Sequence, residues 1–207
     1  MNVKCREENR TGETIRMNTE RKRNIHTTVI TQIALMAALQ CIISPFALTF
    51  PFSPVPVSLA TLMLYLSVYI LGKKNAVISC GIYLLIGLVG LPVFSGFTGG
   101  IGKVLGPTGG YMLGYLFLVY ITGVVVDKWS GAGNYINYLM QGFGMFLGTA
   151  VCYLFGSLWL AYQSQMSVGT ALMTGAFPFI PGDLVKIIIG VLVGNNIRKR
   201  MLKAGVL

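Results

Sequence analysis

Six long apolar segments limit how this chain can fold more than any other feature of its sequence. A helix needs about 20 residues to cross the hydrocarbon core of a membrane, and lipid offers no hydrogen-bond partners to an irregular backbone. Charged residues make up 11% of the 207 residues, against about 25% in soluble domains. We therefore predict an all-α integral membrane protein with six transmembrane helices, at residues 28–48, 57–71, 76–93, 111–126, 136–162 and 171–197.

The basic residues predict the orientation of these helices. Seven of the 16 Lys and Arg precede the first segment, and four follow the last one within 198–203. The loops 72–75 and 127–135 contain three more, whereas the three loops on the other side contain only Lys103. Lys and Arg collect on the cytoplasmic side of membrane proteins. Both termini are therefore predicted to be cytoplasmic, and the net charge of +10 needs no nucleic-acid partner to explain it.

Polar segments flank the apolar region at both ends. Residues 1–26 contain seven basic and four acidic side chains and no apolar run after Met1, which does not fit a cleaved signal peptide. We predict a cytoplasmic N-terminal tail at 1–26, a membrane domain at 27–200 and a cytoplasmic C-terminal tail at 201–207. A multi-pass protein of the bacterial plasma membrane, surrounded by lipid, is the expected result.

Two of the three loops predicted to face outward have unusual compositions. Residues 49–56, TFPFSPVP, contain three prolines, and seven of the 17 residues in 94–110 are glycine. The triplet Thr-Gly-Gly occurs twice in the second loop, first as Thr98, Gly99 and Gly100. Glycine lets a backbone approach a ligand closely and exposes N–H groups in turns. The loop is predicted to contribute to a ligand site, with a merely flexible loop as the alternative.

An acid and a base lie inside the last apolar segment. Asp183 and Lys186, in PGDLVK, share one face of a helix that Pro181 is predicted to begin. Measured from Arg198 at about 1.5 Å per residue, they lie roughly 22 and 18 Å from the inner surface, in the outer half of the membrane. Charges at such depth are costly and are usually paired or functional. They are predicted to line a pocket that opens outward, or else to form a purely structural ion pair.

The sequence lacks the motifs that several other functional classes require. The chain has no GxxxxGK[ST] phosphate loop and no HExxH motif, and its single His, His26, lies in the polar tail. The four cysteines are too scattered for a metal site or a disulfide framework. Asp183 is the only carboxylate in the predicted spans, which is a weak basis for ion-coupled transport. We predict no enzyme activity and no cofactor, and expect that uphill transport would use energy from a partner.

Small residues on the first span indicate where a partner could bind. Ala34 and Ala38 are four residues apart, a spacing that allows close approach between helices in lipid. Packing inside the protein itself is the alternative.

Four sequence blocks together resemble the BioY family, the biotin-binding S components of energy-coupling-factor (ECF) transporters. The similarity covers roughly 28–197, and its motifs are PVPVSLATL, GFTGGIGKVLGPTGGYMLGY, GSLWLA and PGDLVK. The resemblance implies a six-helix subunit that captures biotin with high affinity from outside. It also implies a transmembrane coupling protein and two cytoplasmic ATPases as partners, and release of biotin when the subunit topples in the membrane.

The resemblance also implies roles for single residues. Asp183 and Lys186 match the Asp and Lys of PGDxxK that contact biotin, and Ala34 and Ala38 match the helix 1 motif that docks the coupling protein. By location and chemistry, Tyr111 and Trp159 are added to the predicted pocket with Thr98, Gly99 and Gly100. A Gln is expected in the first motif where this chain has Ala60, so a polar contact is missing there. An S component for another vitamin and a self-sufficient carrier are the alternative functions.

Overall fold

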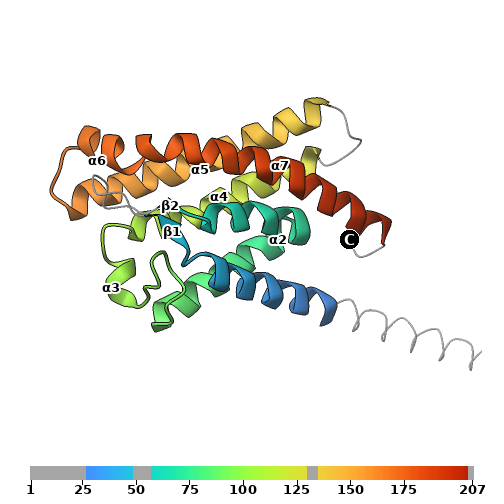
Figure 1. The fold of residues 1–207 in the computed structure, drawn as a ribbon, viewed down its shortest axis with the longest axis horizontal. Coiled ribbons are helices and arrows are strands. Elements are labelled where there is room, and N and C mark those ends of the chain that lie inside the picture. The colour runs from blue at the N-terminus through green and yellow to red at the C-terminus, as the bar shows by residue number, and fades with distance from the viewer. Residues whose placement is uncertain (1–26, 49–56, 130–134, 205–207) are drawn as a thin grey trace, which may run out of the picture.

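The computed structural model describes residues 27–48, 57–129 and 135–204 as a bundle of helices (Figure 1). The predicted tail at 1–26, the proline-rich loop at 49–56 and the end of the chain at 205–207 lie outside the described residues. Four helices are long and apolar enough to cross a membrane: α2, α4, α5, and α7 together with the short helix α6 before it. A shorter apolar helix, Thr27–Ile43, precedes them.

The predicted second and third spans are the two arms of one bent helix, α2 (Ala60–Val89). Gly72 breaks the helix with a φ of 72° and a ψ of 172°, and the chain reverses its direction there (Figure 1). Glycine adopts this backbone conformation without the steric cost that a Cβ would add. The Asp127 carboxylate of α4 accepts a hydrogen bond from the Lys73 N–H at 3.1 Å, which caps the second arm.

The helices α4 and α5 lie close to the ranges predicted from the sequence. Helix α4 (Gly109–Trp129) and helix α5 (Tyr135–Gln163) match 111–126 and 136–162. The last segment is divided into α6 (Val168–Gly175), the 3-10 turn η1 (Phe177–Phe179) and α7 (Ile180–Lys203). With helix Thr27–Ile43 and the two arms of α2, each of the six predicted spans contains a helix among the described residues. The first helix ends at Ile43 and not at 48, and the second begins at Ala60 and not at 57. Helix α7 continues three residues into the predicted C-terminal tail.

Short elements gather at one end of the bundle. The strands β1 (Ala47–Leu48) and β2 (Val57–Ser58) form a two-residue antiparallel pair, and the four-residue helix α3 (Ile101–Val104) lies within the glycine-rich loop. The start of helix Thr27–Ile43, the bend of α2 and the end of α7 lie at the opposite end (Figure 1). The loops predicted to be outward and those predicted to be cytoplasmic are therefore separated, while the orientation in the membrane stays a prediction.

Small residues let α4 and α5 approach each other closely. A Cβ on Gly114 would lie 2.9 Å from Cys152 Sγ, and one on Gly148 would lie 3.0 Å from the Leu118 carbonyl oxygen. Close backbone approach through glycine is typical of helices that pack in lipid, where dispersion contacts replace the hydrophobic effect. The tight α4–α5 pair supports one wall of the site described below.

The contact between α2 and α7 depends on Gly194, whose added Cβ would overlap the buried ring of Tyr69. We expect Gly194→Ala to lower the free energy of unfolding by about 1–3 kcal/mol, the usual cost of overpacking. Gly142→Ala is the matched control, because its Cβ would lie 3.9 Å from the nearest atom, Val191 Cγ2. Thermal unfolding in detergent checks the difference; equal stability of the two variants would contradict it.

Candidate functional site

A break in the last apolar segment places a helix N-terminus inside the bundle. Helix α6 ends at Gly175, and the chain passes through the Phe177–Phe179 turn before α7 begins at Ile180. Pro181 lies in the first turn of α7, where its missing N–H has no cost, and Asp183 follows it there. The predicted helix start is confirmed, one residue earlier than expected. The positive end of the helix dipole is thus next to the acidic side chain.

The buried charged pair of α7 is held by groups from β2, α2 and α5. Lys186 Nζ donates to Asp183 Oδ1 at 2.8 Å, and both residues are less than a tenth exposed. The same ammonium donates to the Ser58 carbonyl oxygen at 2.6 Å and to Thr61 Oγ1 at 3.2 Å. The Tyr153 hydroxyl of α5 donates to Asp183 Oδ2. Because an unpaired buried charge is costly, this network is what permits the pair to lie at this depth.

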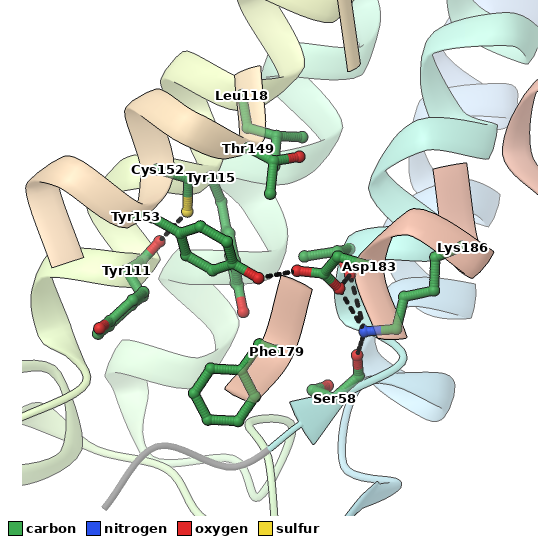
Figure 2. Close-up of a pocket in the computed structure, with 11 residues that line it drawn as sticks. Ser58, Tyr111, Tyr115, Leu118, Thr149, Cys152, Tyr153, Phe179, Asp183 and Lys186 are labelled. Atoms are coloured by element: carbon green, nitrogen blue, oxygen red, sulfur yellow. Dashed lines mark hydrogen bonds and ion pairs between the residues drawn. The ribbon is translucent and has the colours of Figure 1, made fainter. Parts of the chain in front are cut away.

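A cavity of about 50 Å³ lies beside the pair (Figure 2). Aromatic rings from α4, α5 and the turn before α7 form much of its wall, and the Asp183–Lys186 pair forms its charged side. Its lining consists of Ser58, Thr61, Tyr111, Tyr115, Leu118, Thr149, Cys152, Tyr153, Phe179, Asp183 and Lys186. Apolar walls with a few converging polar groups are typical of sites for small organic molecules.

A wider cavity lies toward the end of the bundle that carries the short elements. It measures about 400 Å³ and shares Ser58 with the smaller cavity. Phe46 and Phe97 contact each other edge to face at 5.6 Å in its wall, and both are more than half exposed. Ser58 therefore lies between the two cavities.

Three of the predicted pocket residues line the inner cavity. Asp183 and Lys186 lie together as expected, and Tyr111 joins them from α4. The Tyr111 hydroxyl donates to the Gly175 carbonyl oxygen at 2.9 Å, which ties α4 to the end of α6. Tyr111 thus lines the cavity while its hydroxyl is held at the end of α6.

Trp159 does not line the inner cavity. Its indole Nε1 donates to the Gly106 carbonyl oxygen at 2.9 Å, and its side chain packs against Gly109 and Gly110 at the start of α4. These contacts fasten the end of the glycine-rich loop to α5. A substrate contact from Trp159 stays a prediction.

The predicted Thr-Gly-Gly residues also have structural partners. A Cβ on Gly99 would overlap the Leu91 carbonyl oxygen, and Gly100 has a φ of 89° with its N–H donating to the Gly87 carbonyl oxygen at 2.7 Å. Thr98 Oγ1 donates to the Ser95 carbonyl oxygen at 3.0 Å. These glycines allow the loop to fold against the end of α2, and the described lining of the inner cavity does not include them. Their predicted role in binding is untested.

Residues beyond the predicted set complete the site. Thr61, Thr149 and Tyr153 contribute hydroxyls, and Ser58 contributes its carbonyl oxygen to Lys186. Their one signal in the sequence is that they are polar side chains in or beside apolar spans. Ala60, where a Gln was expected, is buried, and polar contacts at this point of α2 come from its neighbours Ser58 and Thr61.

The proposed docking motif lies on the outer face of helix Thr27–Ile43. Ala34 and Ala38 are exposed, whereas Ala37 between them is 1% exposed and faces the bundle. Among the described residues, Ala34 and Ala38 are therefore not covered by packing inside the protein and remain accessible to a partner. Its function as a docking site stays a prediction.

The fold and the site define a polytopic membrane protein with a small, partly charged cavity for an organic solute. Residues 17–203 match the model of the BioY family. The chain is 32% identical to the biotin transporter BioY of Thermotoga maritima over 73% of this chain and 86% of that protein. It is 33% identical to the biotin transporter BioY of Lactococcus lactis over 72% of this chain and 78% of that one.

A solved structure agrees with these sequence similarities. The crystal structure of an S-component for biotin from an ECF-type ABC transporter matches with a TM-score of 0.78 and 31% identity, covering 85% of this chain and 93% of that one. The chain belongs to the BioY family. The resemblance inferred from the sequence motifs is thereby confirmed, and the protein is a multi-pass membrane protein.

Breaking the buried pair should destabilise the protein more than removing it. Lys186→Met leaves an unpaired buried carboxylate, so we expect a loss of about 3 kcal/mol in the free energy of unfolding. Asp183→Asn with Lys186→Met leaves no unpaired charge and should cost clearly less than the sum of the single changes. Thermal unfolding of the single and double variants in detergent measures this coupling. Additive losses would show that the pair is not energetically coupled.

Proposed function

We propose that this protein is the biotin-binding S component of an ECF-type transporter, which captures biotin with high affinity from outside. The similarity to the solved S-component for biotin carries this proposal. The relatives are named as biotin transporters, and the charged and aromatic side chains around the inner cavity of this chain suit the chemistry of biotin.

The chemistry of biotin fits the groups in the cavity. Its ureido ring offers two N–H donors and a carbonyl acceptor, its valerate chain ends in a carboxylate, and its bicyclic ring is apolar. The Asp183 carboxylate can accept N–H donors, and the Lys186 ammonium can donate to the ureido carbonyl or to the valerate carboxylate. Aromatic side chains such as Tyr111 and Phe179 can pack on the ring system. Buried polar groups left unpaired by an analogue would discriminate strongly against it.

Binding has to widen the inner cavity and exchange hydrogen-bond partners. About 50 Å³ holds roughly three or four water molecules, which is less than biotin needs. We propose that biotin enters from outside through the wider cavity beyond Ser58. Lys186 would exchange its contacts with the Ser58 carbonyl and Thr61 for contacts with the ligand.

Calorimetric titration of the purified protein with biotin tests this function. We expect binding by the unsubstituted protein, and losses of about ten- to a hundredfold in Asp183→Asn and Lys186→Ala, because each removes hydrogen bonds to a charged group. Asp127→Asn is the matched control, because Asp127 lies in the separate ion pair with Arg198 at 3.2 Å. Thermal unfolding of each variant shows whether it is folded.

The alternatives give different results in the same assay. Binding of thiamine or riboflavin in place of biotin would indicate an S component for another vitamin. Unchanged binding in both site variants would leave Asp183 and Lys186 as a structural ion pair. Biotin uptake that persists in cells without the ATPase partners would indicate a self-sufficient carrier.

We further propose that the exposed face of helix Thr27–Ile43 docks a transmembrane coupling protein, which connects this subunit to two cytoplasmic ATPases. Ala34→Trp should then abolish biotin uptake in cells that contain the partners, because the large ring prevents close helix packing. Biotin binding by the purified variant should not change. Phe143→Trp, on the exposed face of α5, is the control and should preserve uptake. Lost binding in Ala34→Trp would contradict the docking role.

A further inference from the structure

An apolar crevice lies on the far side of the site, between α5 and α7. It has a volume of about 130 Å³. One stripe of residues on each helix forms it, at the three- and four-residue spacing of a single helix face. The lining residues are Phe146, Thr149, Ala150 and Tyr153 of α5, with Ile180, Asp183, Leu184 and Ile187 of α7.

The crevice suits a hydrocarbon chain and has no unpaired hydrogen-bonding group for a polar ligand among its described lining residues. It lies between two membrane-spanning helices, and its borders Phe146 and Leu184 are 49% and 45% exposed. Its polar groups are already satisfied within the protein. Thr149 Oγ1 donates to the Met145 carbonyl oxygen at 2.8 Å, and Tyr153 donates to the carboxylate of Asp183. In a bilayer, the chemical partner for such a surface is the acyl chain of a lipid.

A thin wall separates this crevice from the inner cavity. Thr149, Tyr153 and Asp183 line both spaces. Thr149 and Asp183 are short, so the Tyr153 ring is the largest part of the wall, and its hydroxyl points to Asp183 (Figure 2). The hydrogen bond between Tyr153 and Asp183 thus joins α5 to α7 between the two spaces.

We propose that a lipid acyl chain occupies the α5–α7 crevice and that Tyr153 keeps this chain out of the substrate cavity. The hydrogen bond to Asp183 holds the ring across the opening. Loss of the ring would merge the crevice with the inner cavity and let hydrocarbon compete with the substrate. The presence of the chain does not depend on the identity of the substrate; the competition rests on the proposed biotin function.

Photo-crosslinking in lipid nanodiscs, without any substrate, tests whether Tyr153 keeps an acyl chain out of the inner cavity. The probe is a phosphatidylcholine with a diazirine on one acyl chain, and mass spectrometry locates the labelled residues. In the unsubstituted protein we expect label on Phe146 and Leu184, and none on Leu118, which is fully buried behind the wall. In Tyr153→Ala, label should reach Leu118. Tyr153→Leu serves if the Ala variant does not fold, and Leu154→Ala, 53% exposed on the same helix, is the control.

Biotin affinity gives a second readout. Tyr153→Phe keeps the ring but loses the hydroxyl, so we expect about tenfold weaker binding in nanodiscs and in lipid-free amphipol alike. Tyr153→Ala should bind more weakly in nanodiscs than in amphipol, because the long, mobile acyl chains of the bilayer enter the merged space more readily than the short alkyl groups tethered to the amphipol polymer. Absence of label from Phe146 and Leu184, or from Leu118 in the folded Ala and Leu variants, would overturn the proposal. Failure of the unsubstituted protein to bind biotin would instead refute the proposed function, and the crosslinking result would stand.

Discussion

The pairing of Asp183 with Lys186 in an apolar environment is the interaction on which the rest of the structure depends. Two buried charges need more than each other, because their desolvation cost exceeds their mutual attraction unless further hydrogen bonds satisfy them. The Ser58 carbonyl of β2, Thr61 at the start of α2 and Tyr153 of α5 supply those bonds. The pair therefore fixes where three segments that are distant in sequence must meet, and it places their polar groups around one cavity.

The helices around this cavity differ in how tightly they pack. Glycines let the backbones of α4 and α5 approach each other closely, so that wall is tightly packed. Side-chain hydrogen bonds join α5 to α7 at two levels, Tyr153 to Asp183 near the start of α7 and Gln141 to Asn195 toward its end. The apolar crevice beside the Tyr153–Asp183 contact is a consequence of this looser packing. A subunit that must admit a solute and later release it needs one wall that can yield, and the α5–α7 side has the weaker connection.

The same polar groups would serve stability and binding. In the described structure, Lys186 and Asp183 are satisfied by protein partners, and biotin would replace some of these partners with its own donors and acceptors. Such an exchange would leave both charges paired before and after binding. A ligand that lacks the matching groups would leave them unpaired and would bind poorly.

The sequence by itself determined the membrane class, the extent of most spans, the break before α7 and the family. These follow from local patterns: an apolar run of the right length, a proline before an acid, and motifs whose residues are close in the chain. Even there, only the structure shows that the chain reverses at Gly72 and that the last segment is divided into α6 and α7.

Only the tertiary structure decided which side chains surround the pair. Tyr153 and Asp183 are 30 residues apart, and Lys186 and Thr61 are 125 apart, so no helical periodicity relates them. The sequence likewise ranked Trp159 and Tyr111 alike, whereas in the structure Tyr111 lines the cavity and Trp159 bonds to the glycine-rich loop. Periodicity reports which face of a helix is apolar, but the rotation and tilt of each helix against its neighbours depend on packing. That packing selects the polar groups that meet, and it therefore decided the composition of the site.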